Sequence, residues 1–131
     1  MFTSLPHARL IALDLETTGL HAAHDRIVEV AAVCWQDGRE VGAFQSLVNP
    51  ERPIPPQAIA VHGITDAMVA SAPTIEVILP AFMAFCQGDA VIAHNAKFDL
   101  GFLRQACERH GVPLFTTPVV DTLATARRRL L

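Results

Sequence analysis

Two carboxylates lie two residues apart in an apolar segment near the start of the chain. Residues 10–20 read LIALDLETTGL, and Asp14 and Glu16 interrupt a run that is otherwise apolar on both faces. That run predicts a central strand covered on both sides. Residues i and i+2 of a strand point the same way and lie about 6.6 Å apart. Two acids at this spacing suit hard divalent cations, which prefer oxygen ligands.

A third acid belongs to a later segment, AVIAHNAKFDLGFL (90–103), in which a buried strand runs into a helix. Asp99 falls in the first turn of that helix, on one stripe with Phe102, Leu103 and Ala106, so it should face the sheet. The helix dipole alone favours an acid there, but it does not explain Asp14 and Glu16. Three inward carboxylates repel one another and lose hydration unless cations or hydrogen bonds compensate. We therefore expect a metal site.

Periodicity and turn residues predict the elements that must position these acids. Strands are predicted at 9–16, 26–35 and 40–49, and Asp37-Gly38 gives a tight hairpin between the last two. A proline-rich loop with a turn of helix follows at 50–65. The remaining order is α-β-α-β-α, with elements at about 74–87, 90–93, 96–110 and 117–122 before a final helix. The prediction is an α/β mixed sheet with an N-terminal three-strand meander and flanking helices.

Local signals predict how the helices begin and end. Thr74 is a candidate N-cap, and Pro80 should kink that helix or divide it in two. Asn95 can cap the helix that carries the third acid, and this alone would account for the residue. Asp121 or Thr122 should cap the final helix, so Asp121 is interpreted as a cap and not as a metal ligand.

Composition limits the function classes. A chain of 131 residues with 51% hydrophobic content suits a single domain. The net charge of −3 and pI near 6.0 give no global basic field, so any polyanion must be met locally. Three irregularly spaced cysteines argue against a disulfide framework and a structural zinc site, which predicts a reducing, cytoplasmic setting. No long apolar segment suggests a membrane partner.

Three motifs together resemble a known family. DLETTG (14–19), VHGIT (61–65) and HNAKFD (94–99) resemble the first two motifs and the intervening loop of the DEDD superfamily of 3′–5′ exonucleases. The resemblance is greatest to the DEDDh type and to the proofreading epsilon subunit of bacterial DNA polymerase III. It implies an RNase H-like sheet, a single-stranded nucleic-acid 3′ end as substrate and two Mg²⁺ or Mn²⁺ ions as cofactors. A polymerase subunit is a further candidate partner.

The resemblance also implies residue roles. Asp14, Glu16 and Asp99 would be the catalytic acids and metal ligands. Substrate-binding positions follow the motifs: Thr17, Thr18, Gly19, Leu20, His62, His94, Asn95 and Phe98. The amides and hydroxyls of the Thr-Thr-Gly turn would hold the terminal nucleotide, with Leu20 against its base. Outside the motifs, Glu29 is interpreted as a structural residue that pairs with a neighbour.

A departure from the family concerns its third motif, H-x-A-x-x-D, which supplies a general base and a fourth carboxylate. HNAKFD satisfies that pattern by letters, but its position directly after a buried strand assigns it to the second motif. No other match follows it, and the end ATARRRLL carries no helix stop signal. We expect a C-terminally incomplete exonuclease domain over 1–131, with weak metal binding and little activity, because of either a fragment boundary or a truncated reading frame.

Two functional hypotheses follow. The first is a metal-dependent 3′–5′ exonuclease that hydrolyses terminal phosphodiester bonds, with DNA as the expected substrate. The second is a non-catalytic nucleic-acid-binding or regulatory domain of the same fold. The first is favoured because a domain without catalytic function has no need to keep three acids and the Thr-Thr-Gly turn. RNA remains an alternative substrate, and proofreading, repair and RNA trimming are alternative roles.

Overall fold

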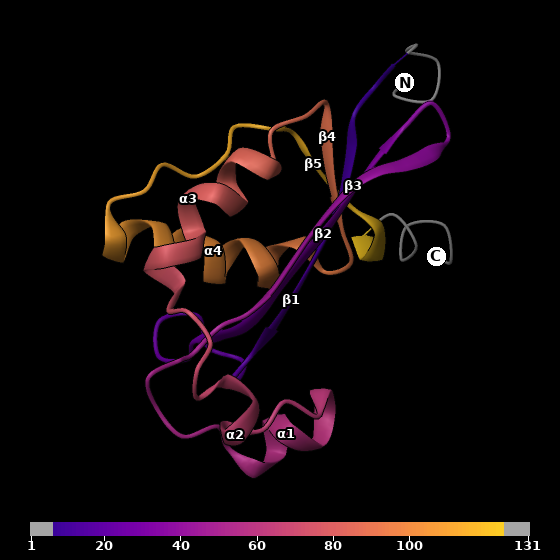
Figure 1. Cartoon of the computed structure of the whole chain (residues 1–131). Coiled ribbons are helices and arrows are strands. Elements are labelled where there is room, and N and C mark those ends of the chain that lie inside the picture. The colour runs from indigo at the N-terminus through magenta and orange to yellow at the C-terminus, as the bar shows by residue number, and fades with distance from the viewer. Residues whose placement is uncertain (1–6, 125–131) are drawn as a thin grey trace.

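A computed structural model describes residues 7–124 of the chain. Five strands form one sheet in the order β3-β2-β1-β4-β5 (Figure 1). The strands are β1 (Leu10–Thr17), β2 (Ile27–Gln36), β3 (Arg39–Leu47), β4 (Ala90–Ala93) and β5 (Val119–Asp121). The helices are α1 (Pro56–His62), α2 (Asp66–Val69), α3 (Ile75–Phe85) and α4 (Ala96–His110). The predicted three-strand meander and the later order α3, β4, α4, β5 are confirmed, whereas α2 was not predicted.

The sheet is mixed, as expected. β1 pairs antiparallel with β2, and β2 pairs antiparallel with β3, whereas β4 runs parallel to both β1 and β5. Asp37 and Gly38 join β2 to β3 with φ angles of 55° and 77°. A two-residue hairpin with both φ angles positive needs residues such as Asp and Gly, which tolerate that conformation. The hairpin prediction is therefore confirmed.

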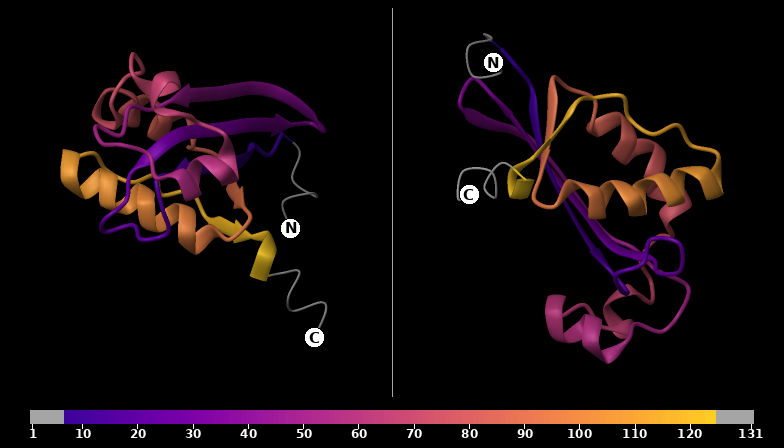
Figure 2. Two further views of the ribbon diagram at one scale, coloured as in Figure 1. Left: turned by 90° about the horizontal axis from the view of Figure 1, so that it is seen from below. Right: turned by 180° about the vertical axis from the view of Figure 1, so that it is seen from behind.

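Helices α3 and α4 cover one face of the sheet (Figures 1 and 2). Ile11, Leu13 and Leu15 are buried on that side, whereas the intervening Ala12 and Asp14 are exposed on the other. The prediction that β1 is covered on both faces is thus wrong for the described part of the chain, in which no helix packs over the second face. Small apolar residues such as Ala12 made the strand look more buried than it is.

The helix α4 matches its predicted bounds and its buried stripe, which consists of Asp99, Phe102, Leu103 and Ala106. Helix α3 begins after Thr74 but continues through Pro80 without dividing. Of the two predicted alternatives, a kink or a division at Pro80, the division is therefore wrong. Leu79, Phe82 and Met83, which flank the proline, are all buried against the sheet. Their burial stabilises the helix by enough to offset a missing backbone hydrogen bond.

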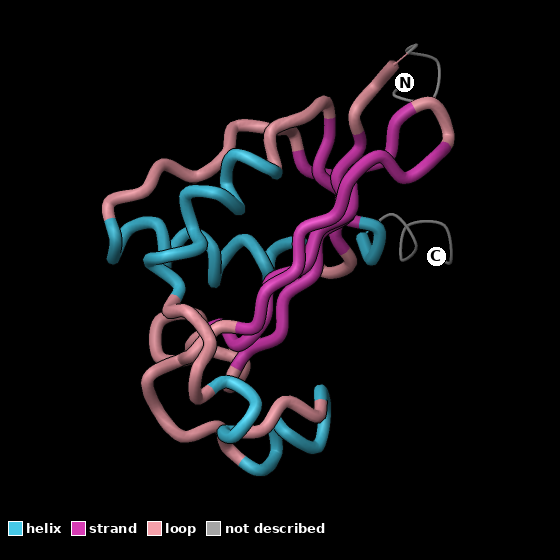
Figure 3. The backbone as a smooth tube through the Cα atoms, in the orientation of Figure 1, coloured by secondary structure: helices cyan, strands magenta, loops and turns pink. Residues whose placement is uncertain are grey.

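Helices α1 and α2 lie at one end of the sheet, apart from α3 and α4 (Figure 3). Helix α1 has no buried residue of its own. A small apolar cluster of Val28, Ile54, Ile64 and Val69 anchors the segments on either side of it, and the partly buried Ala58 and Ile59 of α1 pack against this cluster. This arrangement leaves α1 as a wall beside the end of β1. No helix among residues 7–124 is long and apolar enough to cross a membrane.

Candidate active site

The two acids of β1 project from the sheet face that the helices leave open. Asp14 is exposed and Glu16 is half-buried, with Glu29 of β2 directly opposite Glu16. Partial burial raises the pKa of both carboxyls, and neighbouring charges raise it further: Glu29 acts on Asp14, and Asp14 acts on Glu16. The two acids therefore form one interacting pair, as the strand alternation predicts.

Asp99 joins this pair from the first turn of α4. Asp99 is 4% exposed, and the pKa of its carboxyl is raised from 3.8 to about 7. Burial is the largest cause, and the charges of Asp14, Glu16 and Asp121 contribute the rest. Asp99 therefore does not face the solvent, and it lies near the other two acids. Three acids from two elements thus act on one another at the junction of β1 and α4.

Compensation for this negative charge is incomplete. Among residues 7–124, neither Lys nor Arg forms an ion pair with Asp14, Glu16 or Asp99. No group of three or more His, Cys, Asp or Glu side chains in the same range is arranged to hold a metal ion. The chemistry of the donors nevertheless fits Mg²⁺ or Mn²⁺, because unpaired carboxylates of raised pKa are the ligands that hard cations stabilise. A bound cation would require these side chains to converge further.

Two neighbouring acids have structural partners, as predicted. Glu29 accepts a hydrogen bond of 2.8 Å from the side-chain amide of Gln45. Asp121 Oδ1 accepts from the backbone N–H groups of Leu123 and Ala124, at 3.0 and 3.4 Å. Asp121 is therefore the N-cap of a helical turn at 122–124, which confirms its predicted role. The rest of the predicted final helix lies outside the described residues.

A cleft of about 500 Å³ opens beside the acids, between the end of β1, the loop after it and α1. Leu20 and Val61 expose large apolar side chains, 78% and 83% exposed, on its opposite walls. Seven of the predicted site residues line the cleft: Glu16, Thr17, Thr18, Gly19, Leu20, His62 and Phe98. Asp14, His94, Asn95 and Asp99 are not among its lining residues. Residues of all three sequence motifs therefore lie around one cleft, and Glu16 is the one of the three candidate catalytic acids that lines it.

The Thr-Thr-Gly turn is stabilised by its own side chains. Thr17 donates its hydroxyl to the Gly19 carbonyl at 2.6 Å, and Thr18 donates its hydroxyl to Asp25 at 3.3 Å. Both hydroxyls thus have internal partners, although the resemblance implies that they hold the nucleotide. Among the described residues, the backbone N–H groups of Gly19 and Leu20 have no protein acceptor. These two amides are the donors that the turn leaves available to a ligand.

His62 connects α1 to the end of β1. The Ile64 N–H donates to His62 Nδ1 at 3.0 Å, so Nδ1 is an acceptor and the ring proton is on Nε2. Nε2 then donates to the Thr17 carbonyl, also at 3.0 Å. Both ring nitrogens are engaged with backbone, so His62 can offer a ligand in the cleft only its ring face and edge. Its geometry is that of a residue that fixes one wall.

His94 and Asn95 lie at the start of α4, outside the cleft lining. His94 Nδ1 is 3.0 Å from the Thr122 hydroxyl, which places its ring toward β5. Asn95 occupies the N-cap position of α4, as predicted, but it has φ 65° and ψ 57° and its side chain makes no capping hydrogen bond. Its backbone N–H instead donates to Asp121 Oδ1 at 3.1 Å. The left-handed conformation, which Asn tolerates, turns the chain sharply from β4 into α4.

Sequence reasoning missed several residues of the site. Asp25 accepts hydrogen bonds from Thr18 and from the His21 N–H, and it also lines the cleft. Its carboxylate packs so closely on Gly19 that a Cβ there would lie 2.4 Å from Asp25 Oδ2. Val61 of α1 faces the cleft as well. Of these residues, only Gly19 could be singled out from the sequence, because its place after two threonines indicated a turn. Nothing in the sequence identified Asp25 as its partner.

Comparisons with known proteins give a consistent result. A family model described as RNase_T, exonuclease, matches residues 11–130. The chain is 40% identical over 123 residues to DNA polymerase III PolC-type of Streptococcus sanguinis, an alignment that covers 94% of this chain and 8% of the polymerase. A second PolC-type polymerase, from Streptococcus agalactiae, is also 40% identical, over 124 residues. The chain therefore spans about a twelfth of the length of these relatives.

Solved structures with the same fold are exonucleases. Exonuclease X in complex with 5′ overhanging duplex DNA is 39% identical, with a TM-score of 0.70 over 92% of this chain and 63% of that one. E. coli exonuclease I in complex with a dA16 oligonucleotide has a TM-score of 0.83 over 94% of this chain and 30% of that one. Its identity of 18% makes it a likeness of fold alone, which agrees with the predicted RNase H-like sheet.

Proposed function

We infer the function from the premise that this chain belongs to the exonuclease family whose model matches residues 11–130. We propose a metal-dependent 3′–5′ exonuclease domain that hydrolyses terminal phosphodiester bonds of nucleic acid, with DNA as the substrate. The observation that carries the proposal is the burial of Asp99, in the first turn of α4, next to the two acids of β1. Its carboxyl is buried beside Asp14 and Glu16, an arrangement that costs stability unless a cation or proton binds there.

The three acids are the proposed ligands of two divalent ions. Asp14 and Glu16 point to one side of β1, and Asp99 approaches from α4. When bound, Mg²⁺ or Mn²⁺ neutralises the phosphodiester charge and activates water as the nucleophile near pH 7. The protein's part is to hold acids of raised pKa in place before the cations arrive, since the strand and the helix fix their backbones. Because Glu16 also lines the cleft, an ion held by Glu16 would lie beside the scissile phosphate of a strand bound there.

The cleft is the proposed site of the 3′-terminal nucleotide. Leu20 and Phe98 supply apolar surface for a base or sugar. The available N–H groups of Gly19 and Leu20 can donate to polar groups of the nucleotide. His62 acts indirectly by fixing α1 against β1, with Val61 on the same wall. His94 and Asn95 would contact a substrate only beyond the cleft, near β5.

Residues 100–131 contain no H-x-A-x-x-D sequence, so the fourth acid and the general base of the resemblance are not supplied by these 131 residues. A general base contributes typically about 10²–10⁴-fold. We therefore propose that a polypeptide of these residues alone hydrolyses nucleic acid slowly and binds metal weakly. The two PolC-type relatives, in which the matching region is a small part of the chain, support a role beside a polymerase.

The test is an exonuclease assay on single-stranded oligonucleotides labelled at the 5′ or the 3′ end, with Mg²⁺ or Mn²⁺. The expected result is stepwise shortening of the 5′-labelled strand and early release of a labelled mononucleotide from the 3′ label. Glu16→Gln should abolish it, whereas Glu40→Gln, the same change on an exposed strand position, should not. Retained shortening in Glu16→Gln would overturn the catalytic role given to Glu16. No shortening by the parent, even with a third motif appended, would overturn the exonuclease proposal in favour of a binding domain.

A further inference from the structure

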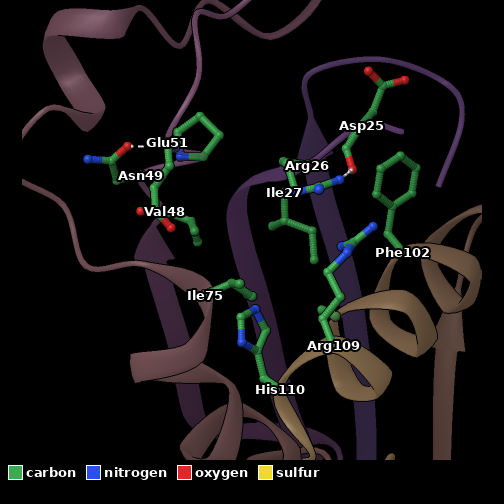
Figure 4. Close-up of a pocket in the computed structure, with 12 residues that line it drawn as sticks. Asp25, Arg26, Ile27, Val48, Asn49, Glu51, Ile75, Phe102, Arg109 and His110 are labelled. Atoms are coloured by element: carbon green, nitrogen blue, oxygen red, sulfur yellow. Dashed lines mark hydrogen bonds between the residues drawn. The ribbon is translucent and has the colours of Figure 1, made fainter. Parts of the chain in front are cut away.

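A second cavity lies on the opposite side of the 19–26 loop from the cleft. It has a volume of about 230 Å³ and is lined by that loop, the start of β2, the segment after β3, and helices α3 and α4 (Figure 4). Asp25 lines both the cleft and this cavity, so the two share one wall. None of the three candidate catalytic acids lines it. The cavity is therefore separate from the proposed active site.

Two guanidinium groups enter this cavity from different elements. Arg26 comes from the loop before β2, and Arg109 comes from the last turn of α4, so their side chains approach each other across it (Figure 4). Arg26 Nη1 donates to the carbonyls of His24 and Asp25, at 3.3 and 3.0 Å. Arg52, from outside the cavity, donates to the same His24 carbonyl. Three of the seven Lys and Arg residues at 7–124 thus gather at this loop.

The charge of this cluster is not neutralised by the protein. Among residues 7–124, no Asp or Glu forms an ion pair with Arg26 or Arg109. Burial lowers the pKa of Arg26, and the charges of Arg109 and Arg52 lower it further, each by more than Asp25 raises it. The Asp25 carboxylate is turned into its own loop, where it accepts from Thr18 and from the His21 N–H. Arg26 and Arg109 therefore reach the cavity without a carboxylate partner among residues 7–124.

The other charged groups of the cavity form no ion pair with the two arginines. Glu51 is exposed and adds a carboxylate to the lining, but it is paired with neither Arg26 nor Arg109 among residues 7–124. His110 Nδ1 is 3.5 Å from a carboxylate oxygen of Glu76, so this ring nitrogen already has a partner. The floor is apolar and consists of buried residues: Ile27, Val48, Phe102 and Ala106. An apolar floor lowers the local dielectric constant, which strengthens attraction between the arginines and an anion.

Arg109 forms only weak hydrogen bonds, which a stronger acceptor could replace. Its Nη2 donates to the carbonyls of Ala22 and Ala23, both at 3.4 Å, near the limit of a hydrogen bond. A charge-assisted bond from Arg to a phosphate oxygen is shorter, about 2.7–2.9 Å, and about twice as strong as a neutral one. The cavity volume equals that of roughly seven water molecules, so a phosphate group fits with some of its water.

We propose that this arginine pocket, defined by Arg26 and Arg109, binds a phosphate group. The phosphate can come from a nucleic-acid strand or from free phosphate, and both present the same anionic oxygens to the two guanidinium groups. The site needs no hydrolysis and no metal, so it goes beyond the proposed exonuclease activity. Because Arg109 also contacts the loop whose far side forms the cleft, a bound phosphate would alter the support of that loop.

The test uses the 131-residue chain labelled with ¹⁵N, in a chelator at low salt, so that a failure of the metal-dependent function cannot affect the outcome. Arginine Nε–Hε signals are followed during titration with inorganic phosphate and, separately, with a short single-stranded oligonucleotide that has no terminal phosphate. Arg109→Gln should weaken saturable binding by about tenfold or more, as expected for loss of one charge-assisted contact of about 1.4 kcal/mol. The matched control is Arg104→Gln, an exposed α4 residue outside the pocket.

Saturable shifts of the Arg26 and Arg109 signals with inorganic phosphate support a site open to free phosphate, provided that binding read from the Arg26 signal weakens about tenfold or more in Arg109→Gln and is kept in Arg104→Gln. The same pattern with the oligonucleotide alone assigns the site to a strand. The proposal is overturned if neither probe saturates, or if both variants weaken binding equally, which would indicate only general charge attraction. Arg26→Gln is a second variant for the same titration, used once its amide spectrum shows that it is folded.

Discussion

His62 Nε2 lies 3.0 Å from the backbone oxygen of Thr17, so a residue of α1 holds the end of the strand that carries both catalytic candidates. The Ile64 N–H fixes the other ring nitrogen at the same distance. One hydrogen bond of the His62 ring thus attaches the wall of the cleft to β1, and the other holds the ring in place within α1 and the residues after it. This attachment adds to the packing of Ala58 and Ile59 of α1 on the small apolar cluster.

Replacing His62 with Ala should lower the free energy of unfolding by about 1–3 kcal/mol, because the Thr17 carbonyl and the Ile64 N–H both lose a partner. Urea denaturation gives the value. His62→Gln should recover part of the loss, since its side-chain amide can still reach a backbone carbonyl. The control is His24→Ala, an exposed loop residue. Equal stability of the two alanine variants would contradict the clamp.

Replacing Gly19 with Ala should destabilise the protein by about 1–3 kcal/mol, because the new Cβ would lie 2.4 Å from Asp25 Oδ2 and displace the loop. Gly101→Ala is the matched control. Its Cβ would meet only Ala22 Cβ at 3.5 Å, within a helix that favours Ala over Gly by roughly 0.5–1 kcal/mol. Thermal denaturation should therefore move the two midpoints in opposite directions. A Gly19→Ala protein as stable as the parent would show that Asp25 is free to move.

The raised pKa of Asp99 makes stability depend on pH. Below pH 3.8 the carboxyl is protonated in both the folded and the unfolded chain, so its contribution is fully present there. Between 3.8 and about 7 the unfolded chain releases the proton while the folded chain keeps it. Stability is therefore lost over this range as pH rises, by up to ~4 kcal/mol. Asp99→Asn should remove that loss.

Denaturation of the parent and of Asp99→Asn from pH 4 to 8, in a chelator, measures this difference. The advantage of the variant should grow toward pH 7 and then level off. Glu108→Gln, an exposed acid of the same helix, is the control and should show no such trend. Adding Mg²⁺ or Mn²⁺ to the parent should flatten its profile, since a cation stabilises the ionised carboxyls. A parallel pair of profiles would contradict the raised pKa.

The catalytic proposal predicts a large gain from a third motif. A polypeptide in which residues 1–131 are followed by an H-x-A-x-x-D helix of the family should degrade single-stranded 3′ ends about 10²–10⁴-fold faster than residues 1–131 alone. Asp14→Ala in the longer chain should abolish that activity. Labelled oligonucleotides resolved by length give the rates. Equal rates for the short and long chains would mean that His94 and the three acids suffice, and that HNAKFD acts as the third motif.

The sequence by itself predicted most of the elements and seven of the residues that line the cleft. Period-two and helical patterns gave the meander, β4, α4 and the inward stripe of Asp99, because each pattern reflects which face of its own element is buried. The motifs around Asp14 and Asp99 gave the family, which the family model confirms. Spacing within one element determined these predictions, and such spacing is fixed by local geometry.

Tertiary structure decided whatever depended on contacts between distant segments. Alternation cannot say whether a second layer covers β1, so the open face of Asp14 appeared only in the fold. Asp121, not the side chain of Asn95, supports the turn into α4, and Asp25 closes on Gly19 through a loop. Arg26 and Arg109, 83 positions apart, share a pocket because the loop before β2 packs on the end of α4. Sequence patterns carry no signal for such pairings, because each partner alone is compatible with an ordinary surface position.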